Sequence, residues 1–391
     1  MEQGRGRMSF SRALAVIIFL IISLVGGLMY LGASPHIPIL LTAAFAAVVA
    51  IRSGFSWSEI EKGIMTTIGM GMQSILILMI IGCIIGVWVL AGIVPAMIYY
   101  GLKIISPGIF LVVTCIICAI VSLATGSSWT TAATVGIALM GVGSGLGIPS
   151  SMVAGAIISG AYFGDKMSPL SDTTNLAPAM AGVKLFDHVR HMIWTTGPSM
   201  LIACVLYAIM GMSFAGKELD VTGINTILDT LAKSFTINIW LLIPPLLVIG
   251  MVVMRTPALP GLFGGVVLGG LFAAVFQNAG MAAIIKAAHS GFVSETGIEA
   301  VDKLLTRGGL ESMMGTISLI MIALSLGGVM ESSGMLHSIA LRILTYARST
   351  GSMVVATFFT CVFCNLAAGD QYLSIVIPGR IYKDAFAEKG L

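Results

Sequence analysis

The stretch "SLATGSSWTTAATVG" at residues 122–136 returns in altered form as "NLAAGDQYLSIVIPG" at residues 365–379. The alignment places identical residues on one another: Leu123 on Leu366, Gly126 on Gly369 and Gly136 on Gly379. Upstream, "GVWVLAGIVPAMI" at residues 86–98 is matched by "GVMESSGMLHSIA" at residues 328–340. Solenoid repeats recur about every 20–50 residues along a chain. The two copies seen here are much farther apart in the sequence, so they predict a duplicated half-protein and not a solenoid.

The composition around these copies indicates a chain whose solvent is the lipid bilayer. Apolar residues make up 57% of the sequence and charged residues only 9%, whereas soluble domains carry about 25% charged residues. The net charge of +3 comes from basic residues at segment ends, which suits loops against anionic lipid and excludes a nucleic-acid partner. Catalytic Ser/His/Asp neighbours and metal-ligand spacings are missing, so the sequence predicts neither an enzyme nor a bound cofactor.

Apolar runs long enough to enter or cross a bilayer follow one another along the chain, after a first predicted transmembrane helix near the N-terminus. They lie at about residues 37–51, 72–92, 108–125, 127–163, 192–213, 237–254, 258–277, 312–330 and 352–368. Two amphipathic stretches, "VPAMIYYGLKIIS" and "MLHSIALRILTYARS", are predicted to lie along the membrane interface. We expect three parts: a first transmembrane repeat at 1–213, an inter-repeat loop at 214–236, and a second repeat at 237–391.

The basic residues predict how the two halves are oriented. Arg5, Arg7 and Arg12 place the N-terminus in the cytoplasm by the positive-inside rule. A re-entrant hairpin with its tip at "ATGSSWT" puts the basic loop "KLFDHVRH" at residues 184–191 on the same side, whereas a single crossing puts it outside. The hairpin gives the first half an odd number of crossings. The predicted fold is therefore an all-α polytopic membrane protein with two inverted repeats, re-entrant hairpins and discontinuous helices.

The stretch "FGDKMSPLSDTTN" at residues 163–175 is charged although it follows an uncharged apolar run. We expect Gly164 and Pro169 to interrupt the helix here, since Pro169 lacks an N–H and collides with the carbonyl of Asp165. Pro178 acts in the same way on the carbonyl of Thr174. Carboxylates, hydroxyls and freed carbonyls are oxygen ligands for a hard cation such as sodium. The alternative is a polar loop between two spans.

The two carboxylates of this stretch are predicted to differ in role. Asp172 precedes a hydroxyl and amide cluster, Thr173, Thr174 and Asn175, so we expect Asp172 to exchange a proton for sodium, with Thr173 and Asn175 as further ligands. Asp165 adjoins Lys166, whose ammonium would keep it ionised as a paired structural charge. Asp370 is a candidate second carboxylate or a helix cap. The hairpin tip adds hydroxyls that either bind the ion or satisfy backbone carbonyls: Ser127, Ser128, Thr130 and Thr131.

The motif "GDKMSPLSDTTNLA", together with the upstream "LATGSSWTTAATVG", resembles the NhaC-type Na+/H+ antiporters of the ion-transporter superfamily, and the resemblance runs from about residue 10 to the end. It implies a bacterial inner-membrane antiporter that exchanges cytoplasmic sodium for external protons without a cofactor. Some members instead exchange malate for lactate or arginine for ornithine. Carried over residue by residue, the resemblance points to the same candidates: Asp165, Ser168, Asp172, Thr173, Thr174, Asn175, Ser127, Ser128, Thr130 and Thr131.

Two rival functions stay open at this point. An organic-acid or amino-acid antiporter of the same fold would need Lys166 or Arg380 for its anionic substrate, whereas an ion channel would need a filter sequence that is not evident. A homodimer is also left open. After Gly379 the sequence is too short for a counterpart of the "GDKMSPLSDTTN" element, so the repeat predicts that this counterpart lies beyond residue 391 and that the sequence is truncated.

Overall fold

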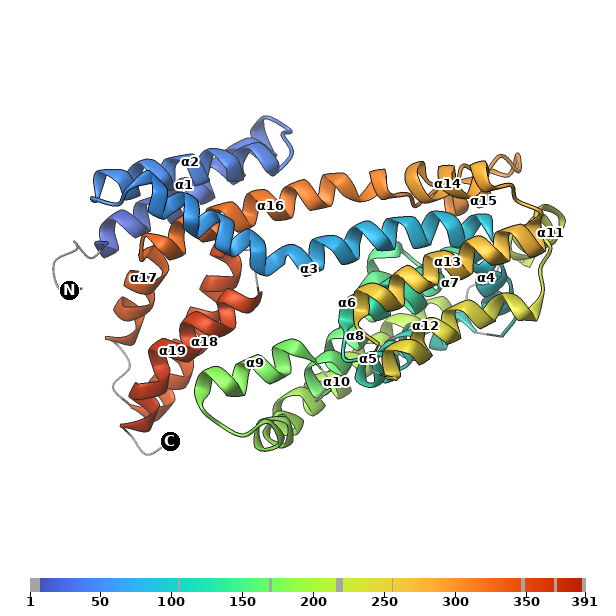
Figure 1. The fold of residues 1–391 in the computed structure, drawn as a ribbon. Coiled ribbons are helices and arrows are strands. Elements are labelled where there is room, and N and C mark those ends of the chain that lie inside the picture. Colours follow the sequence, from blue (N-terminus) through green and yellow to red (C-terminus); the bar gives the residue numbers. More distant parts are fainter. Residues whose placement is uncertain are drawn as a thin grey trace. The chain divides into compact units, whose positions relative to one another are not determined.

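The computed structural model describes residues 8–104, 106–168, 171–215, 221–254, 256–345, 349–368 and 371–388 (Figure 1). Over these ranges the structure consists of helices, with no β-strand and one isolated bridge between Phe292 and Arg307. The predicted all-α class is therefore confirmed. The inverted orientation of the two halves stays a prediction.

The chain divides into two compact units that each take segments from both halves of the sequence. The first unit comprises Met1–Ile75, Asn175–Lys184 and Gly315–Leu391. The second comprises Leu76–Thr174 and Leu185–Met314. These compact units do not coincide with the repeats predicted from the sequence, which stay a prediction.

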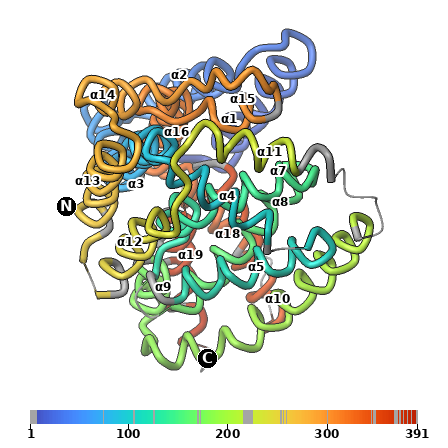
Figure 2. Tube along the Cα trace, turned by 90° about the vertical axis from the view of Figure 1, so that its right-hand side faces the viewer, coloured from blue at the N-terminus to red at the C-terminus, as the bar shows by residue number. Residues whose placement is uncertain are grey.

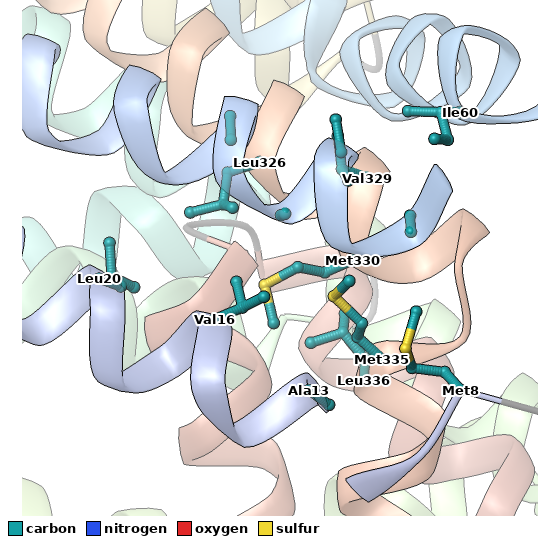
Figure 3. Close-up of a cluster of buried hydrophobic side chains, with 14 of the residues drawn as sticks. Met8, Ala13, Val16, Leu20, Ile60, Leu326, Val329, Met330, Met335 and Leu336 are labelled. Carbon is teal, nitrogen blue, oxygen red and sulfur yellow. The ribbon is translucent and has the colours of Figure 1, made fainter. Parts of the chain in front are cut away.

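The first unit is built around α1 and α2, which pack on each other as a hairpin drawn in blue in Figure 2. Its helices are α1 (Phe10–Val25), α2 (His36–Arg52), the first part of α3 (Trp57–Leu90), most of α9 (Asp172–Ala181) and of α16 (Leu310–Ser332), α17 (Met335–Leu344), α18 (Thr350–Ala368) and α19 (Gln371–Ala387). Ala13, Val16 and Leu20 recur at helical spacing, so α1 presents one apolar face. Figure 3 shows this face against Val329 and Met330 of α16.

The second unit holds the remaining helices. They are the end of α3, α4 (Ile93–Ile104), α5 (Pro107–Thr125), α6 (Ser128–Thr131), α7 (Ile137–Gly145), α8 (Ser150–Met167), α10 (Leu185–Ala215), α11 (Val221–Ser234), α12 (Ile243–Val253), α13 (Ala258–Gln277), α14 (Met281–Ser290) and α15 (Glu299–Leu305). A π-helical turn, Ala132–Gly136, joins α6 to α7, and a 3-10 turn, Ile239–Leu242, precedes α12. Helix α8 packs against both α5 and α10.

Five helices among the described residues are long and apolar enough to cross a membrane. They are Phe10–Tyr30, Trp57–Leu90, Leu185–Phe214, Leu259–Gln277 and Leu310–Ser332. Asn225–Ser234 and Ile239–Met251 form a sixth candidate, bent by 97°. Helix α11 therefore occupies part of the predicted inter-repeat loop. The long run predicted at 127–163 is divided, because Gly147 adopts φ +69° and Pro149 caps a new helix, α8.

The predicted duplication has a counterpart in the backbone. Gly92 and Gly334, which the alignment pairs, both adopt positive φ, at 77° and 74°, and each immediately precedes an amphipathic helix, α4 or α17. Residues with a Cβ atom disfavour positive φ, whereas glycine adopts it readily, so a glycine suits both turns. In each copy the next helix is a long apolar one, α5 or α18, followed by a helix that begins at the hairpin tip or at Gln371. The two stretches therefore share this order of helices, except that the first is divided into α6, a π-helical turn and α7 where the second has α19 alone, and the duplication stays a prediction. The interfacial position of α4 and α17 stays a prediction, and Ile93 and Met335 at their N-termini are buried.

Candidate functional site

The helix that carries the charged stretch is discontinuous, as predicted. Helix α8 ends at Met167, Ser168 is extended at φ −82° and ψ 125°, and α9 begins at Asp172. Pro169 lies outside the described residues. Ser171 caps the new helix, since its Oγ accepts a hydrogen bond of 3.4 Å from the backbone N–H of Thr174. The start of α9 therefore has its own local stabilisation.

The prediction that Gly164 interrupts this helix is wrong. Gly164 lies inside α8, and a Cβ added there would meet the Ala119 carbonyl oxygen of α5 at 2.3 Å. Gly160, one turn earlier, would meet the Cys115 carbonyl oxygen at 2.0 Å. The two glycines lie on one face of α8, four residues apart, where small residues let helix backbones approach closely. Gly164 is therefore a packing position on α5 and not a helix breaker.

Helix α5 leads to the second broken element, the predicted hairpin tip. It ends at Thr125, and Gly126 follows in the left-handed region with φ 69°. Ser127 then caps the short helix α6, since its Oγ accepts hydrogen bonds from the N–H of Thr130 at 3.2 Å and from the Thr130 hydroxyl at 3.1 Å. The helical backbone is therefore interrupted where the sequence predicts the tip, and the re-entrant path of the chain stays a prediction.

The tip and the broken helix meet at Asp165. The Ser128 hydroxyl donates a hydrogen bond of 3.0 Å to Asp165 Oδ2, and both residues are buried, with exposed fractions of 5% and 4%. A carboxylate this deep in an apolar chain is costly unless it has polar partners or an ion. The structure therefore brings a titratable group and a hydroxyl together from two separate breaks in the helical backbone.

The Thr130 hydroxyl bonds to Ser127 Oγ, whereas the hydroxyls of Thr131 and Thr134 bond to the backbone of their own segment. Thr131 Oγ1 donates to the Ser127 carbonyl at 3.0 Å, and Thr134 Oγ1 donates to the Thr130 carbonyl at 2.8 Å. Such bonds to nearby carbonyls are the alternative role that Ser and Thr commonly have in helices. Among the predicted tip residues, Ser128 is thus the one whose described hydrogen bond reaches the carboxylate.

Lys166, which is half-buried, and the buried threonines of α9 form a polar group next to Asp165. Lys166 Nζ donates to Thr173 Oγ1 at 2.9 Å, and the hydroxyls of Thr173 and Ser171 lie 3.2 Å apart. Thr174 Oγ1 lies 3.1 Å from the carbonyl oxygens of both Asp165 and Lys166. These carbonyls belong to the last turn of α8, where the Asp165 carbonyl also accepts a hydrogen bond of 3.2 Å from the Ser168 N–H. Thr174 therefore ties the first turn of α9 to the last turn of α8 across the break.

The remaining candidates are placed less fully. Ser168 is buried at the break, whereas the Asn175 side chain is exposed and the residue belongs to the first compact unit. Asp172 is the first residue of α9, but its side chain lies outside the described part of the structure, and so does Asp370. Sequence reasoning missed Ser171, although a serine just before a helix start is a typical cap.

The geometry suits a small cation better than a transition metal. Among the described residues there is no group of three or more His, Cys, Asp or Glu side chains that could hold a metal ion. The side chains gathered here offer carboxylate and hydroxyl oxygens instead, which are ligands for hard cations. A buried carboxylate can also hold a proton, so the same oxygen atoms can serve either ion.

Comparisons with known proteins agree with this chemistry. The sequence profile of the Na+/H+ antiporter family matches residues 160–391. The chain is similar to the Na(+)/H(+) antiporter NhaC of Bacillus subtilis, with 39% identity across 98% of this chain and 85% of the relative. The NhaC of Alkalihalophilus pseudofirmus is 41% identical across 93% and 79%. The malate-2H(+)/Na(+)-lactate antiporter of Bacillus subtilis is 39% identical across 87% and 73%.

Proposed function

This chain belongs to the Na+/H+ antiporter family, and we propose that it exchanges sodium for protons at a site built around the buried carboxylate of Asp165. It is a multi-pass membrane protein. We further propose that it acts in the bacterial inner membrane, as its family resemblance implies. The basic residues near the N-terminus favour a cytoplasmic N-terminus.

The contact between Asp165 and Ser128 carries the proposal. Charged groups within membrane segments are rare and mark ion pathways, because each costs several kcal/mol unless it is paired or hydrated. Asp165 is 4% exposed, and a hydroxyl from another broken segment donates to it at 3.0 Å. Broken helices that meet in this way are where secondary transporters place their ion sites. Asp165 is therefore the carboxylate that we assign to the exchange.

Antiport follows if one carboxylate holds either a proton or a sodium ion. A proton neutralises Asp165 directly, whereas sodium neutralises it by coordination to the carboxylate and neighbouring oxygen atoms. The empty, ionised site would be costly to carry across the membrane. Reorientation is then favoured only when one of the two ions is bound, and each crossing of sodium is coupled to a crossing of protons in the opposite direction.

Asp172 is the rival carboxylate, and sequence reasoning alone favours it because hydroxyls follow it directly. The contacts of Thr173 and Thr174 support the other assignment. The Thr173 hydroxyl accepts from Lys166, and the Thr174 hydroxyl lies against the carbonyls of α8. Both hydroxyls are thus engaged within the break. The earlier prediction, that Asp172 is the carboxylate that exchanges a proton for sodium, is not tested by these contacts.

Sodium-induced pH change in everted membrane vesicles tests the proposal with two matched variants. Asp165→Asn keeps the size of the side chain and removes its titratable charge, so it should abolish sodium-driven proton movement at normal protein abundance. Asp172→Asn should retain exchange, with an altered sodium constant. Full exchange by Asp165→Asn, with loss in Asp172→Asn, would transfer the role to Asp172.

An organic-anion antiporter is the second candidate, and the half-buried ammonium of Lys166 is the observation that supports it. Lys166 Nζ lies 2.9 Å from Thr173 Oγ1, in the same polar group as Asp165. An ammonium can bind a carboxylate substrate, and one relative is named as a malate and lactate antiporter. Sodium-dependent uptake of labelled malate into vesicles, lost in Lys166→Gln, would establish this function. Without such uptake, Lys166 serves the cation site alone.

A further inference from the structure

We propose that Gly164 and Ser122 are positioning residues for the exchange: they hold α8 against α5 at the separation that lets Asp165 accept the hydrogen bond of Ser128. This inference rests on the proposed role of Asp165 in exchange. Neither residue offers an ion-binding group in the proposal. Both act through the distance between the helix that carries the acceptor and the helix that leads to the donor.

At Gly164 the two helix backbones are in direct contact. A Cβ on this residue would lie 2.3 Å from the Ala119 carbonyl oxygen, 2.5 Å from the Leu123 nitrogen and 2.7 Å from the Ser122 Cβ. Two of these three atoms belong to the α5 backbone, which cannot move aside as the end of a flexible side chain can. Any larger residue at position 164 must therefore push α8 away from α5.

Ser122 ties the same turn of α8 to α5 by a hydrogen bond. Its hydroxyl donates to the carbonyl oxygen of Ala161, and Ser122 is fully buried. Ala161 is four residues before Asp165, so this carbonyl is also the helical acceptor of the Asp165 N–H. The bond therefore ties α5 to the turn of α8 that bears the carboxylate.

The donor of the carboxylate hydrogen bond is attached to the other helix. Helix α5 ends at Thr125, and only Gly126 and Ser127 separate it from Ser128. Ser128 Oγ and Asp165 Oδ2 are 3.0 Å apart, whereas an O–H···O bond is largely lost once the separation grows by about 1 Å. A small increase in the α5–α8 separation would thus break the contact while leaving both side chains intact.

The test measures the apparent sodium constant of exchange in vesicles that contain the full chain. Gly164→Ala should raise this constant about tenfold or more, the effect of losing a hydrogen bond to a charged group. Ser122→Ala introduces no clash and should raise it by a smaller factor. Gly155→Ala is the matched control on the same helix, because its Cβ would meet only the Tyr207 hydroxyl, at 3.3 Å. It should keep the parental constant.

A double-mutant cycle separates positioning from a general loss of packing. If Gly164 acts through the Ser128 hydrogen bond, Gly164→Ala should raise the sodium constant in the parent but not further in Ser128→Ala, since coupled residues are non-additive. Additive effects would overturn the inference. So would parental sodium constants in both Gly164→Ala and Ser122→Ala. If Gly164→Ala fails to accumulate, the same cycle between Ser122→Ala and Ser128→Ala decides.

The outcome for Asp165→Asn keeps the two proposals apart. If this variant still exchanges sodium for protons, the assignment of Asp165 fails, and the positioning inference fails with it. If Asp165→Asn is inactive while Gly164→Ala and Ser122→Ala retain parental sodium constants, only the positioning inference is overturned.

Discussion

Ser128 and its neighbours on the hairpin tip are similar in chemistry but differ in what their hydroxyls contact. Ser128 donates to Asp165, whereas Thr131 donates to the Ser127 carbonyl of its own turn. The sequence places both in one cluster and cannot rank them, because rotation about a helix by one residue redirects a side chain by about 100°. The contact therefore distinguishes the residues that the spacing treats alike.

Ser128→Ala should raise the apparent sodium constant about tenfold to a hundredfold, since a hydrogen bond to a charged group contributes roughly 1.5–3 kcal/mol. Thr131→Val is the matched control, because it loses only a hydroxyl that bonds within the hairpin. Sodium dependence of exchange in everted vesicles measures both. An equal change in the two variants would mean that the hairpin as a whole, and not the Ser128 hydroxyl, sets the sodium affinity.

Asp302 shows how a residue outside the predicted spans organises a loop. Its Oδ1 accepts from the N–H and hydroxyl of Thr296, both at 2.7 Å, and its Oδ2 accepts from the Gly297 N–H at 3.1 Å. The backbone N–H of Thr296 first, and then its hydroxyl, hold the pKa of Asp302 below its ordinary value. The ionised carboxylate therefore stabilises the ordered loop.

Because the pKa of Asp302 is lower in the folded loop, its stabilising contribution is complete above the unfolded pKa of about 3.9 and is lost as the pH falls through the folded pKa. Amide hydrogen exchange at Thr296 and Gly297 should accordingly lose protection at acidic pH, after correction for the intrinsic exchange rate. Asp302→Asn should show weak protection that does not vary with pH. Strong, pH-independent protection in the parent would contradict this account.

At the scale of elements, long helices dock through single large side chains and glycines. Trp88 of α3 is fully buried, and its Nε1 donates to the Gly265 carbonyl of α13 at 2.9 Å. Gly269, one turn further, has no side chain to keep the indole away, since a Cβ there would meet Trp88 Cδ1 at 2.6 Å. Trp88 and these glycines are therefore part of the α3–α13 contact, together with Ile84 and Val87.

Trp88→Phe should destabilise the fold by about 2–4 kcal/mol, because it leaves a cavity and removes the hydrogen bond from the indole to the Gly265 carbonyl. Trp194→Phe offers a control, since Trp194 on α10 is 78% exposed and loses little on truncation. Thermal unfolding of both variants in detergent micelles gives the comparison. A drop in the unfolding midpoint of the same size for the two would show that burial of Trp88 is not what stabilises the contact.

The whole molecule combines two kinds of division. The repeats predicted from the sequence follow the chain order, whereas each compact unit collects segments from both ends. Helices α3 and α16 each contribute residues to both units. The duplication and its inversion stay predictions, and the relative orientation of the two halves depends on how many times the first half crosses the membrane.

The predicted orientation is testable at two positions. Cysteines introduced at Gln3 and Asp187, in a variant whose six native cysteines are replaced, should both be protected from an impermeant thiol reagent in intact cells. The reason is that basic residues near both positions favour the cytoplasmic side. Labelling after membrane disruption provides the positive control. Labelling of one site alone in intact cells would overturn the hairpin and the inversion together.

The sequence alone determines the class of the protein and the positions where its helices break, because both depend on the properties of single segments. Apolar runs, a low charge content and positive-inside loops depend on each segment's own transfer into lipid. The helix break near Ser168 and the turn at Gly126 follow from the residues that favour them locally. The motifs around these breaks also identify the family before any coordinates are considered.

Only the tertiary structure decided which residues meet. The sequence predicts Gly164 as a helix breaker and one unbroken apolar run at 127–163, whereas in the fold Gly164 packs on α5 and the run divides near Gly147. It pairs Asp165 with Lys166 by adjacency, and the structure adds Ser128, which is far along the chain. Such contacts depend on the separation and rotation of whole helices, which arise from packing against neighbours and are not encoded in any one segment.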